Sequence, residues 1–246
     1  MDAASQILFY FLTFLIEIIG TVGGFGSSVF FVPMANYFFE FHQVLGVTSL
    51  LHVFSNLSKI YLFRKGVDYK IFLKIGVPSF IFVVVGAYFS RFLTTYYANL
   101  ILGIFLILFA GFLLLRPSFS FKPTTSNSVL GGSVAGWLAG WLGTGGAVRG
   151  LTLASFNIGK ESFLATSALI DFVVDSSRFG VYAFQGYLTK EMLFLAPILL
   201  IISFIGSYIG KLLLNKISQE TFKKIALWLI LLVGVYSFGY YFYNRN

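Results

Sequence analysis

The chain has 246 residues, of which 58% are hydrophobic and 11% charged, a balance that excludes a water-soluble domain of this size. Its apolar stretches are continuous rather than alternating, which predicts an all-α polytopic membrane protein, because backbone groups in lipid must be satisfied internally. The net charge of +8 comes from basic residues at the ends of apolar segments, where they set topology, and does not indicate nucleic-acid binding.

Eight apolar segments follow one another along the chain. They cover approximately residues 6–35, 44–63, 70–90, 98–115, 128–153, 162–184, 192–213 and 222–243. The polar stretch 116–127 divides them into two sets of four, and features such as Pro78 and Gly86 recur as Pro197 and Gly206. We therefore predict two repeats of about 120 residues, an N-terminal membrane repeat at 1–117 and a C-terminal membrane repeat at 118–246.

The first and fifth segments each contain a dense glycine cluster. The clusters read Gly20-Thr21-Val22-Gly23-Gly24-Phe25-Gly26-Ser27-Ser28 and Gly140-Trp141-Leu142-Gly143-Thr144-Gly145-Gly146. A tight turn at each cluster would start a helix whose free amides and positive dipole end favour an anion. The alternative is close helix packing, which suits Gly132, Gly136, Gly140, Gly206 and Gly210. The cluster residues predicted to bind substrate are Gly23, Gly24, Gly26, Ser27, Ser28, Gly143, Thr144, Gly145 and Gly146.

The second and sixth segments each carry three polar residues with the spacing i, i+4, i+7. The trios are His52, Asn56 and Lys59 in the second segment and Asp171, Asp175 and Arg178 in the sixth. This spacing places each trio on one face of a helix, and charge inside an apolar segment indicates a functional site. The alternatives are snorkelling of Lys59 and Arg178 to a headgroup, and a salt bridge between Asp175 and Arg178 within one helix.

Arg149 lies just after the second glycine cluster and has no basic counterpart in the first repeat. It could neutralise an anionic substrate or pair permanently with Asp171. We predict that Asn56, Lys59, Arg149, Asp175 and Arg178 complete a cationic substrate site. Asp171 and His52 are the predicted coupling residues, since Asp171 has no cation three or four residues away on its own helix. No metal ligands and no cofactor are predicted, and a chain without cysteine has neither disulfides nor thiolate metal sites.

The distribution of Lys and Arg favours one membrane topology. If all eight segments span, the basic residues outside them divide eight to six, which is almost no bias. If segments 6–35 and 128–153 are re-entrant, eleven lie on one face: Arg64, Lys65, Lys70, Lys74, Arg116, Lys122, Lys160, Lys211, Lys216, Lys223 and Lys224. The other face keeps only Arg91, Lys190 and Arg245. This asymmetry predicts two inverted repeats, each a re-entrant glycine-rich hairpin plus three transmembrane helices, with eight plain spans as the alternative.

The motif G-T-V-G-G-F-G-S-S-V-F-F-V-P from Gly20 to Pro33 and its repeat after residue 128 resemble the sulfite exporter TauE/SafE family, also called the toluenesulfonate uptake permease family. The resemblance covers essentially the whole chain. The second copy differs in having Leu153 in place of the closing proline and Arg149 within the motif. The resemblance implies a multi-pass carrier in a bacterial-type plasma membrane, whose substrates would be sulfite, thiosulfate, sulfonates or small carboxylates.

The residues and the resemblance lead to one predicted function. It is secondary transport of a small anion, bound near the membrane midplane between the two hairpins and coupled to protons. The alternatives are a passive anion channel, which would use the same polar groups, and an integral membrane enzyme, for which the sequence has no HExxH pair. The expected partners are the anion and the lipid bilayer, without nucleic acid, and a homodimer is left open.

Overall fold

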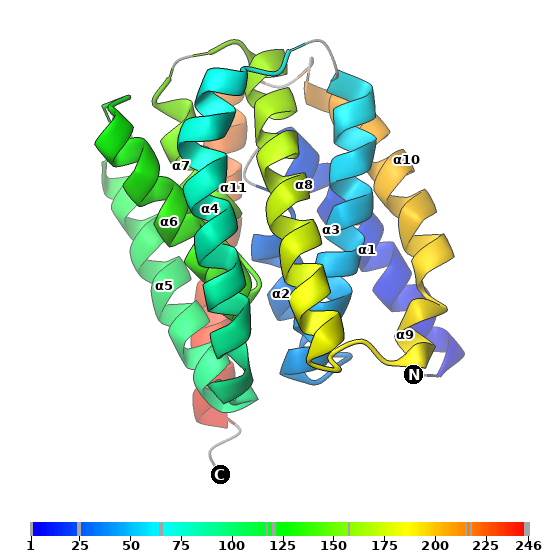
Figure 1. Ribbon diagram of the computed structural model, residues 1–246. Coiled ribbons are helices and arrows are strands. Elements are labelled where there is room, and N and C mark those ends of the chain that lie inside the picture. Colours follow the sequence, from blue (N-terminus) through cyan, green and yellow to red (C-terminus); the bar gives the residue numbers. More distant parts are fainter. Residues whose placement is uncertain are drawn as a thin grey trace.

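The structure is a computed structural model that describes residues 2–23, 26–63, 66–116, 118–119, 122–156, 158–214, 216 and 218–243. Every regular element in these ranges is a helix, and the helices form one bundle (Figure 1). Four helical stretches among them are long and apolar enough to cross a membrane: Ala3–Gly23, Tyr69–Phe92, Tyr97–Leu115 and Ala196–Leu214. The architecture is thus that of an all-α membrane protein, as predicted.

The helices follow the eight apolar segments closely. The first half contains α1 (Ala3–Gly23), α2 (Ser28–Ala35), α3 (Phe41–Phe63), α4 (Tyr69–Phe89), the 3-10 helix η1 (Ser90–Phe92) and α5 (Thr95–Leu115). The second half contains α6 (Thr125–Leu142), α7 (Gly146–Ala154), α8 (Lys160–Phe184), α9 (Lys190–Leu193), α10 (Ala196–Leu214) and α11 (Gln219–Tyr243). The first and fifth segments are therefore each two helices, divided at the glycine clusters.

Local chemistry explains the breaks in these helices. Gly26 has φ 82° and Gly143 has φ 77°, a left-handed conformation that residues with a Cβ rarely adopt. Gly143 directly follows the last residue of α6, the position where a left-handed glycine commonly ends a helix. The seventh segment is also divided, into α9 and α10. Pro197 lies in the first turn of α10, where its missing N–H leaves no hydrogen bond unmade.

Small residues bring several helix pairs into close contact. The principal pairs are α4 with α6, α5 with α11, α3 with α8, α1 with α10, α4 with α8 and α3 with α10. A Cβ added at Gly132 of α6 would lie 2.5 Å from the carbonyl oxygen of Ile75 in α4. One added at Gly210 of α10 would lie 2.6 Å from the Thr21 Cβ of α1. The glycines to which the alternative interpretation assigned a packing role, Gly132, Gly136, Gly140, Gly206 and Gly210, therefore do serve packing.

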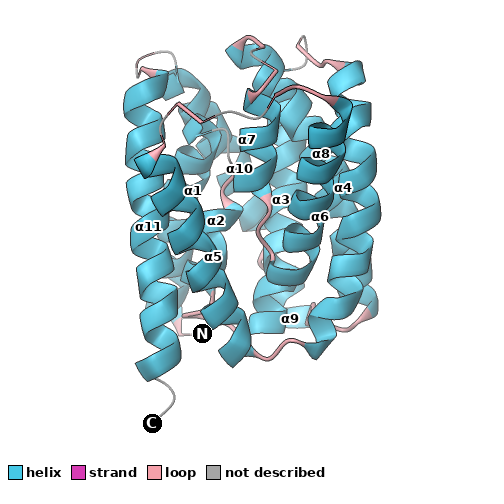
Figure 2. Cartoon of the chain, turned by 90° about the vertical axis from the view of Figure 1, so that its left-hand side faces the viewer, coloured by secondary structure: helices cyan, strands magenta, loops and turns pink. Residues whose placement is uncertain are grey.

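Two short helices follow the glycine clusters. The helix α2 comes after the first cluster and α7 after the second, and both lie among the longer helices of the bundle (Figures 1 and 2). The start of α1 and the end of α11 lie at the same end of the bundle (Figure 1). The two broken helix pairs thus bring irregular backbone to the middle of the protein, where α3 and α8 pass.

Candidate functional site

A pocket of about 330 Å³, including its opening, lies between the two helix breaks and the helices α3 and α8. It brings together thirteen of the residues predicted from the sequence. These are Gly26, Ser27, Ser28, His52, Asn56, Lys59, Gly143, Gly145, Gly146, Arg149, Asp171, Asp175 and Arg178, which line it with Ala139 and Val174. Of the other three, Thr144 contacts Ser28, Gly23 ends α1 without lining the pocket, and Gly24 lies outside the described residues.

Two helix N-termini open onto this pocket. The helix α2 begins at Ser28 and α7 begins at Gly146, and both residues line the pocket together with the residue before each. The first amides of a helix have no carbonyl one turn earlier to accept from, and they carry the positive end of the helix dipole. The Ser28 and Thr144 hydroxyls lie 3.4 Å apart and link the two breaks. This arrangement can donate hydrogen bonds to an anion from two sides.

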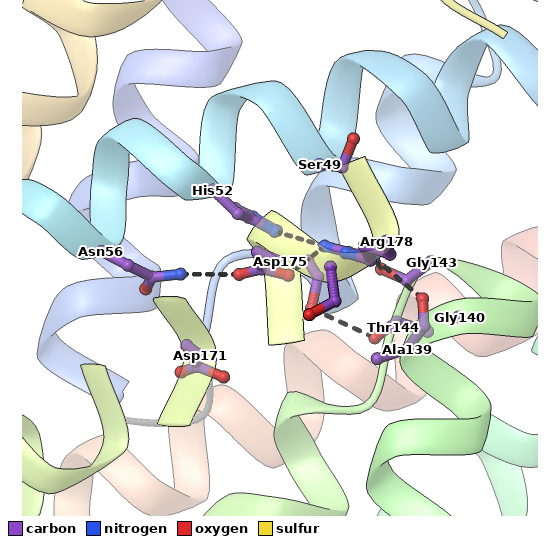
Figure 3. A network of polar contacts seen from close by, with 12 residues as sticks. Ser49, His52, Asn56, Ala139, Gly140, Gly143, Thr144, Asp171, Asp175 and Arg178 are labelled. Carbon is purple, nitrogen blue, oxygen red and sulfur yellow. Dashed lines mark hydrogen bonds and ion pairs between the residues drawn. The ribbon is translucent and has the colours of Figure 1, made fainter. Parts of the chain in front are cut away.

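Arg178 is almost wholly committed to contacts within the protein (Figure 3). Its Nη1 donates to the carbonyl oxygens of Ala139 at 2.9 Å and Gly143 at 2.8 Å, which are orphan acceptors at the end of α6. Its Nη2 pairs with Asp175 at 2.7 Å and lies 2.9 Å from Nδ1 of His52. The side chain is only 1% exposed, so it does not snorkel to a headgroup. Four of its five N–H groups are used, and Arg178 ties α6 to α3 and α8.

The contact with Arg178 fixes the tautomer of His52. A guanidinium can only donate, so Nδ1 of His52 accepts and the ring proton is on Nε2. Nε2 then donates to the Ser27 hydroxyl at 2.9 Å, and Ser27 donates to Oε1 of Glu17. The imidazole is therefore neutral in this structure, and it connects α8 with the start of α2.

A second hydrogen-bonded chain also ends at Glu17. Lys59 Nζ donates to the Ser55 hydroxyl at 2.8 Å, and Ser55 donates to Oε2 of Glu17 at 2.5 Å. Lys59 Nζ is 4.0 Å from the same carboxylate oxygen. Glu17 is fully buried and was not among the predicted site residues. The signal for it was present in the sequence, because Glu17 is the one charged residue in the first apolar segment.

The two aspartates of α8 have different partners. Asp175 accepts from Asn56 Nδ2 at 2.6 Å and also pairs with Arg178, so the salt bridge within α8 that was considered as the alternative is present (Figure 3). Asp171 forms an ion pair with Arg149 of α7, and its other partner is the Ser167 hydroxyl at 3.4 Å. The pairing of Arg149 with Asp171, one of the two roles considered for Arg149 from the sequence, is therefore present in the structure.

The pocket and its immediate surroundings are balanced in charge rather than cationic. Three ion pairs join Lys59 to Glu17, Arg149 to Asp171 and Arg178 to Asp175. The sequence-based expectation of a cationic site counted the three cations but did not include Glu17, and of the two roles considered for Arg149 the structure shows the ion pair with Asp171. The nitrogen Nε is buried without a partner in both Arg149 and Arg178, so each retains one unused donor.

Comparison with protein-family models matches residues 9–237 to the family described as Sulfite exporter TauE/SafE. The match covers nearly the whole chain, including both glycine clusters and every residue that lines the pocket. No curated protein and no solved structure matches the chain significantly.

Proposed function

Since the chain belongs to the sulfite exporter TauE/SafE family, we propose that it is a secondary transporter that binds a small anion in the pocket between its two helix breaks. Membership implies a multi-pass membrane transporter of sulfur-containing anions. The observation that carries the choice of site is the convergence of two helix N-termini and Arg149 in one buried pocket. An anion needs such donors because it loses its hydration shell on binding.

The hydrogen-bond donors of the pocket favour a small oxyanion. Sulfite, thiosulfate, an organosulfonate group or a small carboxylate can accept hydrogen bonds on several sides from main-chain amides and hydroxyls. Ser27 and Ser28 precede and begin α2, and Thr144 precedes α7, so hydroxyls lie near both sets of amides. The free Nε of Arg149 adds a charged donor. Arg178 holds these donors in place, because its guanidinium contacts the end of α6 and His52 of α3.

The arrangement of helices supports two inverted repeats with re-entrant hairpins. The helices of the two halves correspond as α1 to α6, α3 to α8, α4 to α10 and α5 to α11. Under this correspondence the contact of α4 with α6 matches that of α1 with α10, and the contact of α4 with α8 matches that of α3 with α10. The contacts of α3 with α8 and of α5 with α11 match themselves. Three spans per repeat, at 1–117 and 118–246, would invert the second repeat relative to the first. The hairpins would then enter from opposite faces of a plasma or inner membrane, and the pocket would lie near the midplane. Both chain termini would lie on one face.

Transport is coupled to protons in this proposal, and Asp171 and His52 line the same pocket as candidates to carry them. Uphill movement of an anion requires a second ion or the membrane potential, which is worth about 2.3 kcal/mol per charge for 100 mV. Asp171 is buried beside Arg149, so an anion bound at Arg149 would change how readily Asp171 ionises.

A thermal-shift panel of sulfite, thiosulfate, sulfoacetate, taurine and acetate, followed by flux in proteoliposomes, tests this function. At least one sulfur-containing anion should raise the melting temperature, since a ligand that binds only the folded state stabilises it. The same anion should accumulate against its gradient when a pH gradient is imposed. Equilibration without accumulation would indicate a passive channel, and an absence of any binding or flux would refute anion transport.

A further inference from the structure

The charge balance of the pocket constrains how an anion can enter it. Among the described residues, three cations and three carboxylates pair one to one around a site whose charged side chains are buried. Adding a monovalent anion would leave one uncompensated negative charge in a low-dielectric interior, which is strongly unfavourable. The charge can be cancelled if one carboxylate takes up a proton when the anion binds. The structure distinguishes among the three carboxylates as acceptors of that proton.

Asp171 is the least committed of the three. Glu17 is fully buried and accepts from two hydroxyls, and Asp175 accepts from Asn56 and Arg178. Asp171 has one strong partner, Arg149, and a long contact with Ser167 at 3.4 Å. Its side chain is 13% exposed, against 8% for Asp175 and 0% for Glu17. A proton can therefore reach Asp171 with the smallest loss of existing hydrogen bonds.

Arg149 is likewise the most available of the three cations. Arg178 uses four donors within the protein, and Lys59 is bound to Ser55 in the chain that ends at Glu17. Within the part of the chain that the structure describes, Arg149 is ion-paired with Asp171 alone and its Nε has no partner. It also lies in the first turn of α7, where the helix amides would contact the same anion.

From these contacts we propose that Arg149 and Asp171 form an exchangeable ion pair. The anion replaces the Asp171 carboxylate at Arg149, and Asp171 takes up one proton on a carboxylate oxygen. No bond in the anion is made or broken. Each monovalent anion therefore enters with one proton, and the loaded pocket keeps its charge balance. The inference rests on the proposed function, and it specifies the stoichiometry and the residue of coupling.

The charged and titratable groups that face Asp171 come from three helices. The helix α3 contributes Lys59 and His52, α7 contributes Arg149, and α8 itself contributes Asp175 and Arg178. The helices α4 and α6 also pack against α8 but contribute no charged side chain to the pocket lining. His52 is held neutral by accepting from Arg178, and protonating it would break that contact. These surroundings leave Asp171 as the acceptor whose protonation preserves the rest of the network.

Titration calorimetry with ethanesulfonate in two buffers of different ionisation enthalpy measures the protons taken up on binding. Ethanesulfonate is monovalent throughout the neutral range, so any proton must be taken up by the protein. Wild-type protein in detergent should take up about one proton per anion, and the affinity should fall about tenfold for each unit rise in pH while the free Asp171 is ionised. The affinity falls as pH rises because binding consumes a proton and the proton concentration decreases.

Two variants on α8 complete the experiment. Asp171→Asn carries a permanently neutral side chain, so it should bind ethanesulfonate with proton uptake near zero and with a flat pH dependence. Glu161→Gln removes an exposed carboxylate from the start of the same helix and should behave like the wild type. Two results would overturn the exchangeable pair while leaving anion binding intact. One is binding of ethanesulfonate by the wild type without proton uptake, and the other is uptake of one proton by Asp171→Asn. If neither ethanesulfonate nor any anion of the thermal-shift panel binds the wild type, the proposed function itself fails.

Discussion

Arg149 and Arg178 are the same side chain in two different settings, and their surroundings separate a binding role from a positioning role. Arg178 contacts two carbonyls at the end of α6, one carboxylate and one imidazole. Arg149 contacts one carboxylate and stands at the N-terminus of α7. Tyr182, one turn beyond Arg178, adds a hydrogen bond to the Gly140 carbonyl at 2.5 Å. The end of α6 is therefore fixed by α8, and Arg149 is left for exchange.

Replacing each arginine with lysine should have opposite consequences for stability and binding. An ammonium cannot reach acceptors on several sides as a planar guanidinium does, so Arg178→Lys should lose about 2–4 kcal/mol of stability. Arg149→Lys keeps one charge for one carboxylate and should unfold closer to the wild type, but its anion affinity should fall because a forked donor is lost. Melting temperatures and ethanesulfonate affinities of both variants check this. Equal melting temperatures would contradict the positioning role of Arg178.

Glu17 should prove important for stability although it does not line the pocket. Glu17→Gln removes the charge that faces Lys59 and places an amide where two hydroxyls now donate. Breaking a buried ion pair in this way costs about 3 kcal/mol or more. The melting temperature of Glu17→Gln should fall well below that of Glu161→Gln, in which the carboxylate lost is exposed on α8. Similar melting temperatures for the two variants would exclude the role assigned to Glu17.

At the scale of elements, the breaks between α1 and α2 and between α6 and α7 create the site. A continuous helix would satisfy the amides that instead open onto the pocket at Ser28 and Gly146. Gly145 has no room for a side chain, since an added Cβ would collide with the Ala135 carbonyl and lie 3.0 Å from the Ala139 Cβ. The local sequence thus determines both where the helices stop and how closely the turn packs on α6.

The turn after α6 should tolerate no side chain at Gly145. Gly145→Val should abolish transport and lower the melting temperature, because the turn must move away from α6 and carries the start of α7 with it. The matched change Gly180→Val places the same side chain in open space on α8 and should leave both unchanged. Flux and melting temperature are measured for each variant. Normal flux in Gly145→Val would show that transport does not require glycine at this position.

The sequence predicts helices and same-helix neighbours better than contacts between helices. The apolar runs locate the four described helical stretches that are long and apolar enough to cross a membrane, because continuous hydrophobicity over about 20 residues has few alternatives. The i, i+4, i+7 spacing correctly placed His52 and Asp175 on faces that line one pocket. The ion pair between Arg149 and Asp171 and the contact of Arg178 with the end of α6 depend on how α6, α7 and α8 pack. Spacing within one helix carries no information about that packing.

At the scale of the whole molecule, the inverted arrangement predicts a specific pattern of accessibility. The chain has no cysteine, so single cysteines report without background. Ala4→Cys and Glu40→Cys flank the first broken helix pair and should react from one face of the membrane. Ser118→Cys and Gly159→Cys flank the second pair and should react from the opposite face. Labelling with a membrane-impermeant maleimide in oriented vesicles checks this. Reaction of Ala4→Cys and Glu40→Cys from opposite faces would instead support eight plain spans.

The central claim is that a small anion binds at Arg149 in the pocket between the two helix breaks. Calorimetric affinity for sulfite, compared between wild type, Arg149→Ala and Lys216→Ala, tests it most directly, because Lys216 is an exposed cation remote from the pocket. Arg149→Ala should bind at least about tenfold more weakly, since a charge-assisted hydrogen bond is lost, and Lys216→Ala should match the wild type. Wild-type affinity in Arg149→Ala would contradict the claim and place the anion elsewhere.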